Sequence, residues 1–204
     1  MNTELFIAFL LLTLILVLTP GPIVTLVIAT GARDGVRPML VTVAGTGVGN
    51  AILVSSIAFG LSFVVRHAAI LFEVLRWAGA AYLIFLGIQA WRKAGSVSVA
   101  SAPHRGVYFT RGMLVALSNP KTIAFFTAFL PQFVDPTLPI AQQLAVMCAV
   151  SIVMASVTDV AYGLAASAGR AFFLAPARVK LLGRLSGLAL IGGGIWLSLA
   201  RRPA

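Results

Sequence analysis

Six apolar stretches run through this chain, and most of them are long enough to cross a membrane as helices. A helix needs roughly 20 apolar residues to span the hydrocarbon core of a bilayer. Only 10% of the residues are charged, whereas soluble domains carry about 25%. We therefore predict an all-α integral membrane protein with six transmembrane helices. The expected spans are Leu5–Ala32, Met39–Val65, Trp77–Trp91, Gly112–Phe133, Ile140–Ala168 and Leu185–Ala200.

The basic residues predict how these spans are oriented. Cytoplasmic loops of membrane proteins carry an excess of Lys and Arg. Ten basic residues fall on one side of the predicted spans and four on the other, so we expect both termini outside and the richer side in the cytoplasm. The net charge of +10 is explained by this orientation, and no nucleic-acid partner is expected. The two sets are Arg33, Arg37, Arg92, Lys93, Arg105, Arg111, Arg170, Arg178, Lys180 and Arg184 against Arg66, Arg76, Arg201 and Arg202.

The longest polar segment divides the chain into two similar halves. We expect residues 1–91 and 112–204 to be three-helix repeats of one membrane domain, joined by a basic cytoplasmic linker at 92–111. "RWAGAAYLIFLGI" in the first half resembles "RLSGLALIGGGI" in the second, and Thr19-Pro20 matches Asn119-Pro120. Because three spans is an odd number, the second repeat must be inverted, which is typical of secondary transporters. The alternative is that membrane helices share these residues by composition alone.

Prolines interrupt the first and fourth spans. An unbroken helix over Leu5–Ala32 would be about 42 Å long, which exceeds the ~30 Å core. Pro20 and Pro22 cannot donate to the carbonyls of Leu16 and Leu18, and Pro120 cannot donate to that of Ala116. We predict that both spans are broken, and that freed carbonyls and helix N-termini meet a polar solute near the midplane. The alternative is a pair of ordinary proline kinks.

Two ionisable residues fall inside predicted spans. Asp159 is the only acid deep in one, and Lys121 is the only base. An unpaired ionised Asp at the bilayer centre costs about 2.5–3.5 kcal/mol on insertion scales, so it needs a partner, water or a proton. Asp159 is a candidate proton carrier or ligand for a substrate ammonium group. It could instead form a static pair with Lys121.

Other chemistries find little support in the sequence. The run Gly45–Asn50 has no preceding strand and no following Lys, so we interpret it as close helix packing with Asn50 hydrogen-bonding inward. His67 and His104 lie in predicted loops, and no metal site or cofactor is expected. No span offers a His to activate a Ser, which argues against an intramembrane hydrolase.

Several motifs resemble one transporter family. "LVLTPGP", the Gly45-x-x-x-Gly49 helix, "LRWAGAAYLIFLGI" and above all "NPKTIAFFTAFLPQFVDP" are similar, in order and over nearly the whole chain, to the lysine exporter (LysE) family of amino-acid efflux proteins. Ile23 and Asn50 depart from the family pattern, which often has a polar residue and an Asp at these positions. The resemblance implies proton antiport.

We therefore expect a secondary transporter, not an enzyme, that exports a small amino acid or derivative across a bacterial inner (plasma) membrane. The lipid bilayer and the amino-acid substrate are its expected partners, and a homo-oligomer is compatible with the sequence. The alternatives are a passive channel or a non-transporting assembly subunit. The candidate substrate-binding and coupling residues are Thr19, Pro20, Gly21, Pro22, Asn50, Asn119, Pro120, Lys121 and Asp159.

Overall fold

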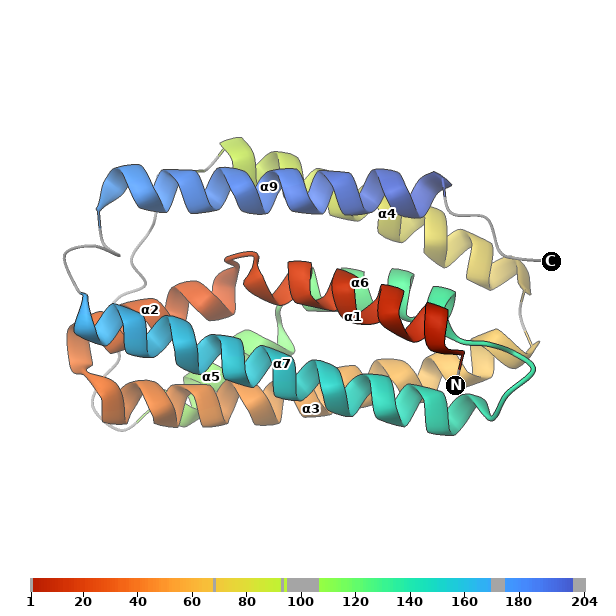
Figure 1. Ribbon diagram of the computed structural model, residues 1–204, viewed down its shortest axis with the longest axis horizontal. Helices are drawn as coiled ribbons and strands as arrows, with labels where there is room; N and C mark the ends of the chain where they lie inside the picture. Colours follow the sequence, from red (N-terminus) through yellow and green to blue (C-terminus); the bar gives the residue numbers. More distant parts are fainter. Residues whose placement is uncertain (1, 68, 93, 95–106, 170–174, 200–204) are drawn as a thin grey trace.

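The computed structural model describes residues 2–67, 69–92, 94, 107–169 and 175–199, and within these ranges it is helical, without strands (Figure 1). Most of the predicted linker and the last five residues lie outside this part, as do Lys93, Arg105 and Arg170. The helices are α1 (Thr3–Leu18), α2 (Pro22–Asp34), α3 (Val36–His67), α4 (Ala69–Arg92), α5 (Tyr108–Leu117), α6 (Pro120–Phe129), the 3₁₀ helix η1 (Leu130–Phe133), α7 (Ile140–Ala168) and α9 (Pro176–Leu199).

Four of the predicted spans are supported by length and hydropathy in the described part of the chain. Val36–Leu61 of α3 and the whole of α7 are each unbroken and apolar enough to cross a membrane. The pair α1 and α2 bends by 47°, and α5 bends by 42° against α6 and η1. α4 and α9 have 24 residues each and begin eight and nine residues before the predicted third and sixth spans. α5 begins at Tyr108, inside the segment expected to be linker.

The two predicted breaks are present, and prolines define where the chain turns. Pro22 is the first residue of α2 and Pro120 the first of α6, positions where the missing N–H costs no helical hydrogen bond. Asn119 caps α6, because its Oδ1 accepts a hydrogen bond from the Lys121 N–H at 3.2 Å. The residues between the paired helices, 19–21 and 118–119, are not helical, so each apolar run is interrupted rather than bent within one continuous helix.

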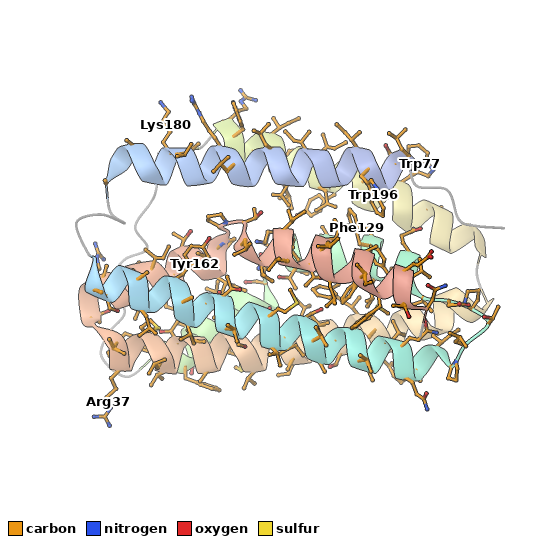
Figure 2. All side chains as sticks on the ribbon, viewed as in Figure 1. Arg37, Trp77, Phe129, Tyr162, Lys180 and Trp196 are labelled. Atoms are coloured by element: carbon orange, nitrogen blue, oxygen red, sulfur yellow. The ribbon has the colours of Figure 1, made fainter. Side chains whose placement is uncertain are left out.

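The broken helices lie between two layers. Figure 1 shows α4 and α9 side by side along one face of the bundle, with α1 and α6 in the middle and α3, α5 and α7 opposite. Stacked rings join α6 to α9, since Phe129 and Trp196 lie 5.7 Å apart with 9° between their planes (Figure 2). Two apolar clusters fill the interior: a larger one around Phe9, Phe126 and Met147, and a smaller one around Ile23, Val27 and Met39.

Glycines allow α3 and α5 to touch through their backbones. A Cβ on Gly45 would lie 2.0 Å from the Phe109 carbonyl oxygen, and one on Gly112 would lie 2.3 Å from that of Thr42. Gly49 is similarly close to Met113. This confirms that the glycine run packs helices rather than binding phosphate.

A second glycine crossing joins α4 and α9, which run antiparallel. A Cβ on Gly87 would lie 2.7 Å from the Gly187 carbonyl oxygen, and a Cβ on Gly194 would lie 2.8 Å from the Ala80 carbonyl oxygen. The predicted repeat matches Gly87 to Gly194 and Gly79 to Gly187. Exchanging the two repeats turns the contact of Gly87 with Gly187 into a contact of Gly194 with Gly79. The structure has the contact of Gly194 one residue along, at Ala80.

The turn before α7 is fixed by one buried amide. The Gln143 side chain donates to the Asp135 carbonyl at 2.8 Å and accepts from the Asp135 N–H at 3.0 Å. The Asp135 carboxylate accepts from the N–H and hydroxyl of Thr137, and these bonds lower the pKa of Asp135. This acid is therefore held as a carboxylate at one end of the bundle.

The glycine crossing of α3 with α5 gives a direct test of the packing. Gly45→Ala should destabilise the protein by about 1–3 kcal/mol, because its methyl group overlaps a backbone carbonyl that cannot move aside. Gly60→Ala, on the same helix, should leave stability unchanged or slightly higher, since nothing lies within 4 Å of the added Cβ. Thermal unfolding in detergent measures both. Equal melting temperatures for the two variants would contradict the close crossing.

Candidate functional site

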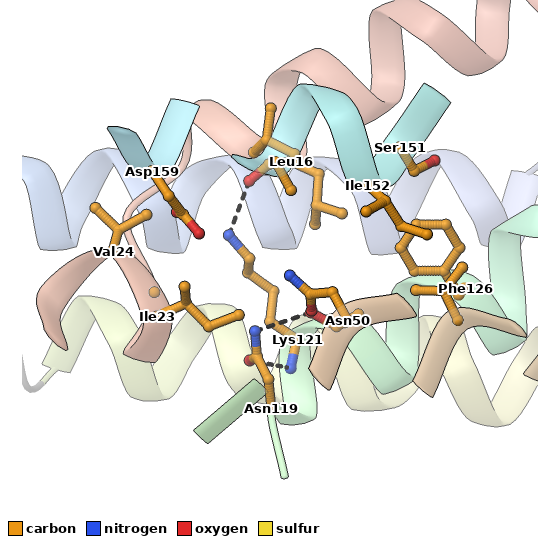
Figure 3. Close-up of a pocket in the computed structure, with 15 residues that line it drawn as sticks. Leu16, Ile23, Val24, Asn50, Asn119, Lys121, Phe126, Ser151, Ile152 and Asp159 are labelled. Carbon is orange, nitrogen blue, oxygen red and sulfur yellow. Dashed lines mark hydrogen bonds between the residues drawn. The ribbon is translucent and has the colours of Figure 1, made fainter. Parts of the chain in front are cut away.

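A cavity lies where the two breaks meet, between the two apolar clusters (Figure 3). The centre of a water molecule can move within about 50 Å³ of this cavity. That is room for roughly three to five water molecules. The lining residues come from five helices and both breaks: Leu16, Val17, Gly21, Ile23, Val24, Asn50, Val54, Asn119, Lys121, Thr122, Phe126, Ser151, Ile152, Ala155 and Asp159.

The Lys121 ammonium joins the second break to the first. From the first turn of α6 it donates to the carbonyl oxygen of Leu16 at 2.8 Å and to that of Thr19 at 2.6 Å. These carbonyls are at the C-terminal end of α1, where the helix dipole favours a cation. The side chain passes over Gly21, whose missing Cβ would lie 3.4 Å from Nζ. Because Gly21 has no side chain, it leaves room for the Lys121 side chain.

Every carbonyl that the prolines leave unpaired has a partner within the protein. The Leu16 carbonyl accepts from Lys121, and the Leu18 carbonyl accepts from the Tyr162 hydroxyl at 2.7 Å. The Ala116 carbonyl accepts from the Asn119 N–H at 3.1 Å. In this conformation the carbonyls are therefore bonded within the protein, and their contact with a solute stays a prediction. The reason is that unpaired backbone at membrane depth must be satisfied by protein or water.

Asp159 lies on α7 and is 4% exposed. Its Oδ2 accepts a hydrogen bond from the Thr46 hydroxyl of α3 at 3.2 Å. Figure 3 shows the carboxylate on the side of the cavity toward which the Lys121 ammonium points. Among the described residues no hydrogen bond joins the two charged groups, because Lys121 is bound to the backbone. The carboxylate remains open to the cavity.

Asn50 is 6% exposed and also lines the cavity. Its Oδ1 is one of three buried side-chain atoms in the described part of the chain that have no hydrogen-bond partner. The other two, Thr13 Oγ1 and Gln132 Nε2, belong to residues that do not line the cavity. Asn50 lines the interior cavity, but the hydrogen bond expected of its side-chain oxygen is absent.

The first turn of α2 supplies backbone donors to the same cavity. Its N-cap is Gly21, which makes no side-chain capping bond, and Ile23 and Val24 both line the space. The N-terminal end of a helix carries a partial positive charge and N–H groups that favour an anion. The cavity thus offers the acidic side chain of Asp159 on α7 and the positive end of α2.

The structure brings together most of the predicted site residues. Gly21, Asn50, Asn119, Lys121 and Asp159 line the cavity, whereas Thr19, Pro20, Pro22 and Pro120 shape the breaks beside it.

Two residues of the site were not expected from the sequence. Thr46 and Tyr162 hold the Asp159 carboxylate and the Leu18 carbonyl. Both could have been found by helical spacing, since Thr46 precedes Asn50 by four residues and Tyr162 follows Asp159 by three. In the described part of the chain no group of three His, Cys, Asp or Glu could hold a metal ion.

The fold and the site together define a helical membrane protein whose broken helices enclose a charged cavity. The model of the LysE type translocator family matches residues 14–201. The chain therefore belongs to this family, as its motifs predicted, and is a translocator rather than an enzyme. No solved structure matches it.

Similar proteins cover the whole chain. The homoserine/homoserine lactone efflux protein of Salmonella typhimurium is 34% identical over 204 residues, which is 98% of this chain and 99% of that protein. An uncharacterized membrane protein of Vibrio cholerae is 30% identical over 98% of this chain and 100% of its own length. The leucine efflux protein of Salmonella choleraesuis is 30% identical over 61% of this chain and 60% of its own.

The bonds of Lys121 predict a structural cost for its loss. Lys121→Met should lower the free energy of unfolding by about 1–3 kcal/mol, because the Thr19 carbonyl loses its donor while the Leu16 carbonyl keeps a bond from the Thr19 N–H at 3.2 Å. The matched control is Lys180→Met, because the Lys180 side chain on α9 is exposed and projects from the bundle (Figure 2). Thermal unfolding in detergent compares the two. A Lys121→Met protein as stable as wild type would show that these carbonyls need no charged partner.

Proposed function

We propose that this protein exports a small amino acid or amino-acid derivative from the bacterial cytoplasm by proton antiport. The observation that carries the proposal is the meeting of two proline breaks at one cavity that contains a buried carboxylate and a buried ammonium group. Intramembrane ionisable groups that line a cavity mark substrate and ion pathways. The relatives named as homoserine, homoserine lactone and leucine efflux proteins agree with a substrate of this size and chemistry.

The proposed architecture has six spans in two inverted repeats. Each half has the same order of elements in the structure: a broken pair, a long helix and a 24-residue helix. The antiparallel packing of α4 and α9, with its mirrored glycine contacts, supports the inversion. Inverted repeats with discontinuous helices place the substrate at the repeat interface in secondary transporters.

In the proposed binding mode the substrate lies between the Thr19–Pro22 and Asn119–Lys121 breaks. Its carboxylate faces the N-terminal end of α2, because the Lys121 ammonium already binds two carbonyls. Its ammonium group faces Asp159. A proton and the ammonium group then compete for one carboxylate, so protonation from outside releases the substrate and substrate binding releases the proton. Homoserine and its lactone share the amine that this step requires.

The proposed orientation places the linker end of the bundle in the cytoplasm. One end of the bundle contains the last residues of α2 and α4 and the first residues of α3, α5 and α9 (Figure 1). The opposite end contains the first residue of α1 and the last residue of α9. Arg37 and Lys180 project from this end (Figure 2), and Arg33, Arg92 and Arg111 belong to helix termini there. This clustering is what the excess of cytoplasmic Lys and Arg predicts.

Single-cysteine labelling tests the orientation. In a Cys148→Ala background, which contains no other cysteine, an impermeant maleimide should label Pro136→Cys on intact cells. Asp34→Cys should react only after the cells are permeabilised. Both positions are exposed and lie at opposite ends of the bundle. Labelling of Asp34→Cys but not Pro136→Cys on intact cells would invert the orientation and the direction of transport.

Asp159→Asn tests the coupling step, because it removes the titratable group and keeps nearly the same shape. Efflux of leucine or homoserine driven by a pH gradient should fall at least about tenfold in proteoliposomes, since one charge-assisted bond and the proton site are lost. Exchange at equal pH should survive at a reduced rate, because it does not require an empty carrier to return.

Two controls separate the alternatives to this coupling role. If Asp159 only neutralises Lys121, then Asp159→Asn combined with Lys121→Gln should restore full proton-driven efflux, and that result would contradict the proposal. A passive channel would instead give flux in wild type that does not respond to the pH gradient. Reconstituted amounts are matched by the quantity of folded protein in each preparation.

A further inference from the structure

The unused acceptor of Asn50 has a chemical consequence. A buried side-chain oxygen without a partner costs free energy, so native structures contain few of them, and each calls for a reason. Asn50 Oδ1 is buried on the wall of the cavity, whereas Thr13 Oγ1, the other orphaned oxygen in the described part of the chain, lies at a residue that is 0% exposed and away from it. Only the Asn50 oxygen is in a position to be satisfied by a bound molecule.

The other polar groups nearby are already bonded. The Asn119 amide donates to the Thr122 hydroxyl at 2.8 Å, and the Ser151 hydroxyl donates to its own helix at Met147. Lys121 uses two of its three N–H groups on the first break. Lys121 therefore keeps one N–H, and the groups with unused acceptor capacity on the side of the cavity away from α2 are the carboxylate of Asp159 and Oδ1 of Asn50.

Helical spacing relates the positions of these two acceptors. Thr46, which holds the Asp159 carboxylate, precedes Asn50 by four residues on α3. Residues four apart on a helix lie on the same face, with Cβ atoms about 5–6 Å apart. Asn50 is thus one turn along α3 from the contact that fixes Asp159. A primary ammonium group has three donors and can bond to both acceptors at once.

We propose that Asn50 is the second ligand of the substrate ammonium group, with its Oδ1 and the Asp159 carboxylate forming a pair of acceptors. This assignment rests on the proposed export of amino-acid-like solutes. It makes the amine the group by which the site selects its substrate. A solute whose amine is acylated keeps one uncharged N–H and cannot bond to both acceptors at once, whereas a solute whose carboxylate is amidated keeps both bonds.

Three solutes with one side chain test this assignment on the purified full-length protein: leucine, leucinamide and N-acetylleucine. Isothermal titration calorimetry in detergent should show that wild type binds the first two and not the third. Asn50→Leu should weaken leucine and leucinamide by the same factor, roughly tenfold or more, because the lost bond is to the ammonium group they share. Asn50→Asp keeps an acceptor at the position and should retain binding of both.

The matched control is Thr13→Val, which removes the other orphaned oxygen at constant shape. It should leave all affinities unchanged. Asn50→Leu should not lower the melting temperature, since it removes an unsatisfied buried oxygen, so a loss of binding cannot be ascribed to misfolding.

Several outcomes would overturn the assignment. If Asn50→Leu weakens leucine but leaves leucinamide unchanged, Asn50 serves the carboxylate instead. If it changes neither affinity, Asn50 is not a ligand, although export itself stands. Binding of N-acetylleucine as tight as that of leucine would also refute selection by the amine. If wild type binds neither leucine, leucinamide nor homoserine, the proposed function fails together with this inference.

Discussion

The bonds from the Lys121 ammonium to the Leu16 and Thr19 carbonyls are the interaction on which the site depends. Prolines in an apolar span leave carbonyls without their helical donors, and a membrane offers no bulk water to replace them. Lys121 supplies the replacement from a different half of the chain. The same contact closes the wall of the cavity and fixes the relative position of the two breaks, and the Lys121 side chain lies directly against Gly21.

Much of the fold could be predicted because its causes are local. Apolar length indicated the spans, and the prolines at 20, 22 and 120 marked the two breaks to within a residue. The glycine spacing of Gly45 and Gly49 indicated close helix packing, which the contacts with α5 confirm. α4 and α9 begin before the predicted spans, because both helices continue through charged residues that mark the ends of the apolar runs.

The contacts within the site were harder to predict because they depend on packing between distant segments. The sequence named Lys121 and Asp159 as partners, since they were the only two ions deep in predicted spans. Which atoms they bond depends instead on the bend of 47° that brings the end of α1 within reach of α6. Tyr162 and Thr46 lie one helical turn from Asp159 and Asn50, but their partners, a carbonyl of α1 and a carboxylate of α7, depend on the same packing between distant helices.

The glycine crossings also decide which parts of the molecule are stiff. Where backbone contacts backbone, there are no side-chain rotamers to rearrange. The helix pairs α3 with α5 and α4 with α9 are therefore rigidly packed against each other. Gly31 fastens α2 to α7 in the same way, with a Cβ position 2.6 Å from the Gly163 carbonyl oxygen. Gly79 of α4 is similarly close to Ala128 of α6, so α1 is the described α-helix that no glycine contact joins to a neighbour. Its position therefore depends on side-chain packing and on the bonds that the carbonyls at its C-terminal end accept from Lys121 and Tyr162.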